Sequence, residues 1–207
     1  SFDRHLKSVQ AGGKVVYIVT QPTAQEQLNP TIKNNSTHLV DSISSHPHVV
    51  LDNEKQLQLL RGKVGLINMY PVANAAFAKM LAHIFKLAAD SSSVQVFDAK
   101  DLEACLVLPG RIFIGTSVIR DADNPRLGSM LYQNCLKGSP CVQAKNKPEA
   151  GALLLVGTSS IFDDPEISNR VESAVSYVGG RVCTLFSGVY VNDDAPGLVS
   201  IMMLCGI

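Results

Sequence analysis

Short apolar runs alternate along the chain with polar turns and with longer stretches in which apolar residues recur three and four apart. Four β-branched runs each open a unit that continues with a turn, a helical stretch and another strand: Val15–Thr20, Val64–Asn68, Arg111–Thr116 and Ala152–Thr158. The spacings between successive units are 48, 48 and 42 residues, measured at Ile18, Leu66, Ile114 and Val156. This regularity indicates duplication. Strands that alternate with helices in this way predict an α/β or α+β fold in which helices cover a sheet.

The clearest predicted helix follows the second run. Pro71 suits a first-turn position, and apolar residues recur three and four apart from Val72 to Ala89, so an amphipathic helix is expected there. The last helix is predicted to begin at Pro165, where a proline loses no hydrogen bond, and to end at Gly179.

The third and fourth units resemble each other in letters as well as in plan. Residues Phe113–Asp121 read almost onto Leu155–Asp163, and each segment leads through Asp and Pro into a helix. We therefore predict two pairs of units, residues 1–100 and 101–207, as two tandem ferredoxin-like or shell-type domains. The polar connector at 137–149 is a second possible boundary, and 207 residues also suffice for a single compact domain.

The charge balance excludes some partners. Lysine plus arginine equals aspartate plus glutamate at 18 each, so no net field attracts nucleic acid or an anionic membrane surface. Only 17% of the residues are charged whereas 46% are hydrophobic, which favours a subunit that buries surface against copies of itself. We expect a homo-oligomer, with no nucleic-acid partner and no membrane partner.

The longest apolar stretches are of strand length, well short of the roughly 20 residues that span a bilayer. The start of the chain, Ser1–His5, lacks the basic and then apolar pattern of a secretory signal, so a cytoplasmic location is expected. The five cysteines are odd in number and form no C-x-x-C pair, which predicts reduced, buried thiols, with Cys183 and Cys205 in apolar runs.

Two Gly-Thr-Ser segments, each expected between a strand and a helix, are candidate anion-binding turns. The residues are Gly115, Thr116 and Ser117, and Gly157, Thr158 and Ser159. Backbone N–H groups in such a turn can hold a phosphate, but a tight turn followed by a helix cap explains the same letters. The phosphate-binding patterns G-x-x-x-x-G-K-[ST] and G-x-G-x-x-G are absent from the sequence.

Evidence for catalysis or a metal is thin. His46 and His48 flank a proline on an extended segment and are two conceivable ligands, but no third ligand has suitable spacing, so no metal is predicted. The sequence has no G-x-S-x-G elbow, and a cysteine nucleophile would need a base nearby in space. We leave enzymatic activity open, leaning against it, and predict no cofactor.

The stretch from Lys63 to Leu136 resembles the bacterial microcompartment shell-protein domain. Val64–Asn68 is similar to the opening strand of that family, Ala82–Ala89 to the end of its first helix, and Val94–Lys100 to its second strand. Segments near both ends, Asp3–Pro22 and Ala150–Gly157, are similar to circularly permuted members. The resemblance implies a tandem, permuted shell protein that covers most of the chain.

The same resemblance implies roles for particular residues. Lys86 matches the lysine at the edge between neighbouring tiles, and the loop lining the central pore matches Lys100, Asp101, Leu102 and Glu103. Asp101, Leu102 and Glu103 replace the small, glycine-rich residues that the family has there. Tiles of this kind are trimers or hexamers that pass small metabolites.

A second resemblance is to the pentein fold, which includes guanidine-modifying hydrolases. Leu102–Ser117 is similar to a central strand pair of those enzymes, and Pro196–Ser200 to their approach to the nucleophile. Ser200 stands where those enzymes carry cysteine, so this resemblance implies a hydrolase or an inactive relative.

We therefore predict first a self-assembling structural protein, a shell-type tile with a metabolite pore. The alternatives are a pentein-like hydrolase or its inactive relative, and a regulatory domain that binds a small molecule or phosphate through the Gly-Thr-Ser turns.

Overall fold

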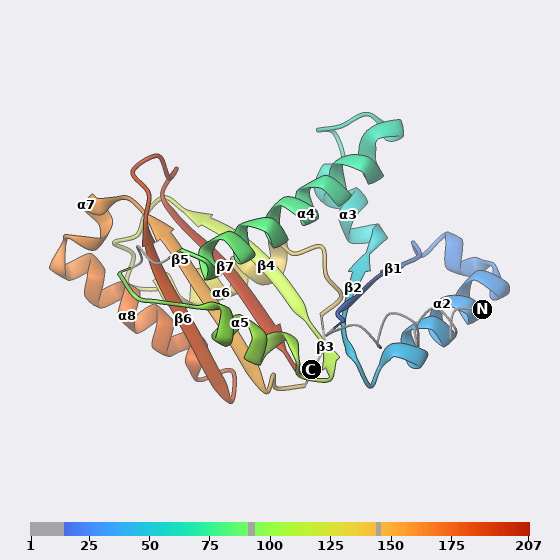
Figure 1. The fold of residues 1–207 in the computed structure, drawn as a ribbon. Helices are drawn as coiled ribbons and strands as arrows, with labels where there is room; N and C mark the ends of the chain where they lie inside the picture. The colour runs from blue at the N-terminus through green and yellow to red at the C-terminus, as the bar shows by residue number, and fades with distance from the viewer. Residues whose placement is uncertain (1–14, 91–93, 144–145) are drawn as a thin grey trace.

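A computed structural model describes residues 15–90, 94–143 and 146–207. Two sheets lie side by side, and helices pack around them (Figure 1). The first sheet has three strands in the order β1-β2-β3, and the second has four in the order β4-β7-β5-β6. This arrangement confirms a mixed α/β protein.

The first sheet is parallel throughout. β1 (Tyr17–Gln21) pairs with β2 (Pro47–Asp52), which pairs with the short β3 (Gly110–Arg111). The crossover between β1 and β2 contains a short 3₁₀ helix, η1 (Glu26–Leu28), and α2 (Pro30–Ile43). Asn29 caps α2 by accepting a hydrogen bond from the N–H of Thr31 at 3.0 Å, and Pro30 occupies the first turn.

The second sheet is mixed. β7 (Leu198–Cys205) runs antiparallel to β4 (Phe113–Ile119) and to β5 (Ala150–Gly157), and β5 runs parallel to β6 (Thr184–Val191). Every residue of β5 is buried. A central strand covered on both faces has no reason to alternate, which explains its continuous apolar sequence.

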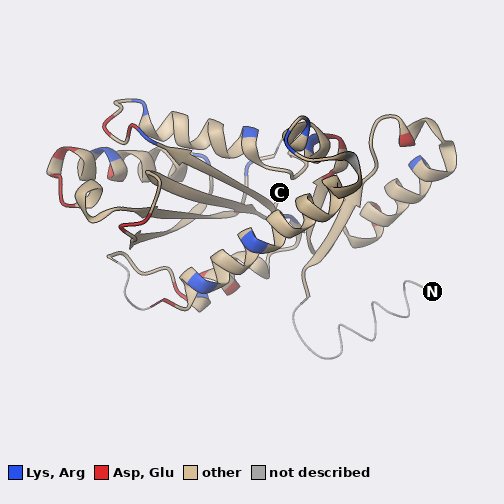
Figure 2. Cartoon of the chain, turned by 90° about the horizontal axis from the view of Figure 1, so that it is seen from above, with Lys and Arg blue, Asp and Glu red and all other residues tan. Residues whose placement is uncertain are grey.

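Helices cover both faces of the second sheet (Figure 2). One face carries α6 (Leu127–Gly138), the one-turn α7 (Ser159–Phe162) and α8 (Pro165–Gly179), and the other carries α4 (Met69–Ala88) and α5 (Ala99–Leu106). Asp164 caps α8 with hydrogen bonds from the N–H groups of Glu166 and Ile167. The predicted bounds of α8 are confirmed, and the helix predicted at Val72–Ala89 is α4.

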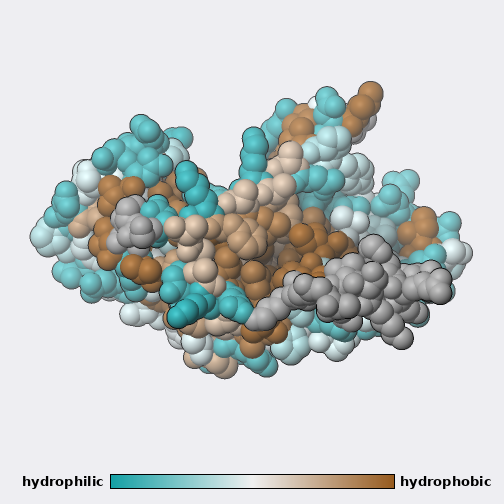
Figure 3. Space-filling model, viewed as in Figure 1, coloured by the Kyte–Doolittle hydropathy of each residue, from teal (hydrophilic) through white to brown (hydrophobic). Residues whose placement is uncertain are grey.

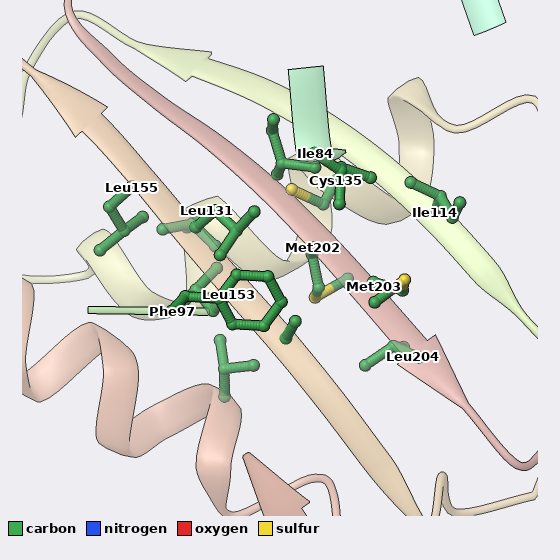
Figure 4. Close-up of a cluster of buried hydrophobic side chains, with 14 of the residues drawn as sticks. Ile84, Phe97, Ile114, Leu131, Cys135, Leu153, Leu155, Met202, Met203 and Leu204 are labelled. Carbon is green, nitrogen blue, oxygen red and sulfur yellow. The ribbon is translucent and has the colours of Figure 1, made fainter. Parts of the chain in front are cut away.

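The hydrophobic core lies between the second sheet and these two helix layers. Phe97, Leu131, Leu153 and Met202 are each fully buried within it, and Figure 4 shows them meeting from four different segments. The same core cluster extends to Val49 and Leu51 of β2, so apolar contact continues from one sheet to the other.

A segment after α6, Ser139–Val142, joins the two sheets, and we name it the strap. The N–H of Asp52 donates to the carbonyl of Pro140 and the N–H of Val142 to the carbonyl of Val50, each at 2.8 Å. On its other side, the Ser139 hydroxyl donates to the carbonyl of Ile114 in β4. The strap fixes α3 (Asn53–Leu60), which follows β2 directly.

The four repeated ferredoxin-like units are not formed. Val64–Asn68 is a loop and a 3₁₀ helix, η2 (Leu66–Asn68), because it runs directly into α4 and no strand lies beside it to pair with. The run Arg111–Thr116 is divided at Ile112 between β3 and β4, which belong to different sheets. The division into residues 1–100 and 101–207 stays a prediction. No helix among the described residues is long and apolar enough to cross a membrane.

Candidate self-association site

The segment Val94–Asp101, between α4 and α5, presents apolar side chains to solvent on a firmly held backbone. Val94 is 68% exposed and Val96 is 59% exposed. Val96 lies immediately before Phe97, which is fully buried in the core. Exposed valines carry no advantage on a solvated surface, so this segment is a candidate for contact with another protein.

Two interactions with β6 hold the backbone of the segment. Gln95 and Val189 exchange backbone hydrogen bonds at 3.4 and 3.0 Å, and the side chain of Gln95 donates to the Ser187 hydroxyl at 2.8 Å. The buried Tyr190 hydroxyl donates to the carbonyls of Leu87 and Phe97 at 3.0 and 3.2 Å, which ties the end of α4 to the segment. Burial raises the pKa of Tyr190, so the hydroxyl keeps its proton at neutral pH.

Gly188 lets the segment approach the sheet. A Cβ at this position would lie 2.8 Å from Cβ of Phe97 and 2.8 Å from the ring of Tyr190. Both distances are far below van der Waals contact, so a larger residue would push the segment off the edge of β6.

The segment ends in a capping box that places two carboxylates at the surface. The Asp98 side chain accepts from the N–H groups of Lys100 and Asp101 at 2.7 and 3.0 Å, and Asp101 accepts from the N–H of Asp98 at 3.2 Å. The site therefore combines exposed valines with fixed acidic groups. Figure 3 shows apolar residues, in brown, gathered on the face that α4 and α5 help to form.

The predicted edge and pore residues lie close to this site but not as expected. Lys86 is exposed near the end of α4, next to Phe85, which is 55% exposed. Lys100, Asp101, Leu102 and Glu103 form the first turns of α5 rather than a loop, and Leu102 is buried in the core. A helix forms there because Asp98 caps it.

The first predicted anion-binding turn lies inside a strand. Gly115, Thr116 and Ser117 pair with β7 as part of β4, and the Ser117 hydroxyl is buried 2.7 Å from that of Ser200. A Cβ at Gly115 would lie 2.2 Å from the carbonyl oxygen of Cys135, so the glycine allows α6 to pack closely on β4.

The second predicted turn does stand between a strand and a helix. Gly157 ends β5, Thr158 precedes α7, and Ser159 begins it. The N–H and the hydroxyl of Ser159 both donate to the carboxylate of Asp193, at 2.7 and 2.8 Å, and these bonds lower the pKa of Asp193. Binding of an external anion at either turn stays a prediction.

The paired histidines differ in environment. His48 is buried on β2, and its Nδ1 bonds to the carbonyl of His46 at 2.8 Å, which fixes the neutral ring with the proton on Nδ1. Burial lowers the pKa of His48. Among the described residues, no three His, Cys, Asp or Glu side chains gather as a metal site would require.

The cysteines are free thiols, and all but Cys183 are buried. The prediction of reduced, buried thiols is thus confirmed for Cys105, Cys135, Cys141 and Cys205, whereas it is wrong for Cys183, which is exposed. Burial raises the pKa of Cys135 and of Cys141, so neither is a reactive thiolate at neutral pH.

No family model and no curated protein matches the sequence. Solved structures do match. The chain is similar to TubZ of Bacillus thuringiensis serovar israelensis, in GDP-form protofilaments, with a TM-score of 0.74 and 17% identity over 99% of this chain and 57% of TubZ. It is also similar to an FtsZ dimer from M. jannaschii, with a TM-score of 0.68 and 17% identity over 96% of this chain and 56% of FtsZ. GDP-bound CetZ1 of Haloferax volcanii gives 0.68 and 16% over 100% of this chain and 59% of CetZ1.

These structures define the fold as tubulin-like, and the chain spans a little over half the length of the proteins that share it. Both family resemblances drawn from the sequence are therefore wrong. The three-stranded parallel sheet, and the β4-β7-β5-β6 order beside it, belong to the tubulin-like fold and not to a microcompartment shell tile or a pentein. The shell-tile function, the pentein hydrolase and the phosphate-binding regulator are overturned by the same matches.

Sequence reasoning missed the exposed segment. Val94–Lys100 was expected to be a paired strand, for which apolar residues need no special explanation, yet only the single bridge from Gln95 to Val189 forms. The available signal was its ending: Asp98 and Asp101 stand three apart, as in a capping box, so the strand had to stop before Asp98.

Proposed function

We propose that the chain is part of a cytoskeletal subunit that assembles head to tail into filaments and responds to guanine nucleotide. The observation that supports this most directly is its likeness, over nearly its whole length, to TubZ in protofilaments and to FtsZ in a dimer. The nucleotide dependence is proposed because TubZ and CetZ1 are both described in GDP forms. A linear polymer replaces the expected trimer or hexamer, and a cytoplasmic location fits such a polymer.

The segment Val94–Asp101 is proposed as one of the contact surfaces between subunits. Its backbone is held by Tyr190 and Gln95, so little conformational entropy is lost when a partner covers it. Val94 and Val96 supply apolar area, and the carboxylates of Asp98 and Asp101 supply charge that can fix orientation.

Sedimentation and negative-stain microscopy test this proposal on the purified chain, without nucleotide, with GDP and with GTPγS. We expect protein in the pellet above a critical concentration and filaments on the grid, with GTPγS lowering that concentration. Val96→Lys should raise the critical concentration at least about tenfold, because a lysine cannot be buried unpaired in a contact.

Val118→Lys is the matched control. Val118 is 50% exposed on the edge strand β4, where a lysine is well tolerated. If Val96→Lys and Val118→Lys assemble alike, the Val94–Asp101 surface is wrong while filament formation stands. If the chain stays monomeric at every concentration and with both nucleotides, the proposed filament subunit is itself wrong.

A further inference from the structure

A cavity of about 200 Å³ lies where α3, α4, β4 and the strap meet. Small residues leave the space open: Ala73 and Ala76 on α4, and Gly138 at the end of α6. The remaining walls come from larger apolar side chains and from Thr116, Pro140 and Gln56. No charged side chain lines the cavity.

Gln56 is the unusual member of this wall. The residue is only 2% exposed, and neither Oε1 nor Nε2 of its amide has a hydrogen-bond partner. An amide buried without partners costs free energy, because the water it would bind in the unfolded chain is not replaced. Natural proteins keep few such groups, and each one that persists calls for an explanation.

The packing around Gln56 makes an accidental burial a poor explanation. Two neighbours on the same helix, Lys55 and Asn53, flank it: Lys55 donates to the carbonyl of Leu136 at 3.2 Å, and Asn53 Oδ1 is also without a partner. Leu59 and Leu60, which line the same cavity one turn later, are apolar. Leucine at position 56 would fill this environment without the cost of an unpaired amide.

We propose that this cavity binds a neutral, single-ring molecule whose carboxamide or lactam edge pairs with the amide of Gln56. Such an edge offers one donor and one acceptor, which matches the two unpartnered atoms of Gln56. The amide atoms lie just beneath the cavity wall, and rotation about the soft terminal torsion of the glutamine side chain brings them to the ligand.

The size and the lining of the cavity set the class of ligand. A dry cavity of roughly 150 Å³ accepts benzene in other proteins, so about 200 Å³ suits one ring with one small substituent. Water alone would satisfy the site poorly, because each water needs two to four polar partners and the walls are mostly apolar. A charged ligand would lose its hydration without meeting an opposite charge.

Benzamide is the probe, and acetophenone, which has the same shape but no N–H group, is the matched comparison. Binding is followed by NMR of methyl-labelled methionine, because Met80 lines the cavity whereas Met130 lies on α6 outside it. We expect benzamide to shift the Met80 methyl signal in a saturable way and to leave Met130 unchanged. Benzamide should bind at least about fivefold more tightly than acetophenone, as a hydrogen-bonded amide edge requires.

Gln56→Leu separates the amide pairing from simple filling of space. We expect this variant to lose the preference for benzamide and to favour acetophenone, while Gln58→Leu, at an exposed position of the same helix, behaves as the wild type. The proposal is overturned if benzamide leaves the Met80 signal unmoved, or if Gln56→Leu keeps the wild-type preference. Both outcomes are independent of filament formation, which is measured separately.

Discussion

The hydroxyl of Tyr190 joins three segments that are distant in sequence, the end of α4, the Val94–Asp101 segment and β6. Its two acceptors, the carbonyls of Leu87 and Phe97, are held by no other side chain that the structure describes. Tyr190→Phe should lower the free energy of unfolding by about 1–3 kcal/mol, because both carbonyls would be left buried without a donor. Urea denaturation followed by circular dichroism measures this loss.

Tyr70→Phe is the control for the same chemical change at a partly exposed ring, where we expect a change within about 0.5 kcal/mol. Equal losses in the two variants would mean that the Tyr190 hydroxyl holds nothing in particular.

His48 predicts a pH dependence of stability. Its folded pKa lies below the usual value, so the unfolded chain binds a proton more readily than the folded one. The stabilisation is present above about pH 6.5 and is lost as the pH falls through the folded pKa, by at most about 1.4 kcal/mol per pH unit. Melting temperatures between pH 8 and 5, of wild type and of His48→Asn, should show a shallower slope in the variant. If His38→Asn, on the exposed side of α2, flattens the slope as much, His48 is not the group responsible.

Residues with a local signal were predictable from the sequence. The proline and the acidic cap at the start of α8 depend only on neighbours in the chain, and the buried thiols only on apolar surroundings. Gln56 and Tyr190 could not be found in this way. What distinguishes them is the presence or absence of a partner far away in sequence, which one chain of letters does not display.

At the scale of elements, one glycine decides whether the Val94–Asp101 segment can lie against β6. Gly188→Ala places a methyl group 2.8 Å from Phe97 Cβ, and overpacking of this kind costs about 1–3 kcal/mol. We also expect faster hydrogen exchange at Val94 and Gln95, whose N–H groups bond to Val189.

Gly179→Ala serves as the control, because a Cβ there would meet only Leu185 at 3.6 Å, and alanine in a helix gains about 0.4–1 kcal/mol. Should Gly188→Ala prove as stable as Gly179→Ala, the close approach would not be a constraint.

The elements themselves were predicted with uneven success, and the errors share one cause. α4 and α8 were found because helical periodicity is a local property. Val64–Asn68 and Val94–Lys100 have the composition of strands but form none, since a strand exists only where another strand pairs with it. The run at Arg111–Thr116 looked like one strand, although a break at Ile112 sends its two parts into different sheets.

For the whole molecule, composition pointed to self-association but to the wrong kind. Low charge and abundant apolar residues fit any subunit that buries surface, whether in a flat tile or in a filament. The choice depends on topology: the β4-β7-β5-β6 order places β7 between strands that are distant in sequence, and no pattern along the chain announces that pairing.

The continuity of the core predicts that the two sheets unfold together. Apolar contacts extend from Val49 and Leu51 in the first sheet to Leu204 in the second, and the strap adds hydrogen bonds to both sides. Thiol labelling in urea, resolved by mass spectrometry of peptides, tests this. Cys183 should react without urea because it is exposed, whereas Cys141 in the strap and Cys205 in β7 should become reactive at one common midpoint. Labelling of Cys141 at a clearly lower urea concentration than Cys205 would instead show that the first sheet and the strap detach as a separate unit, as two domains would.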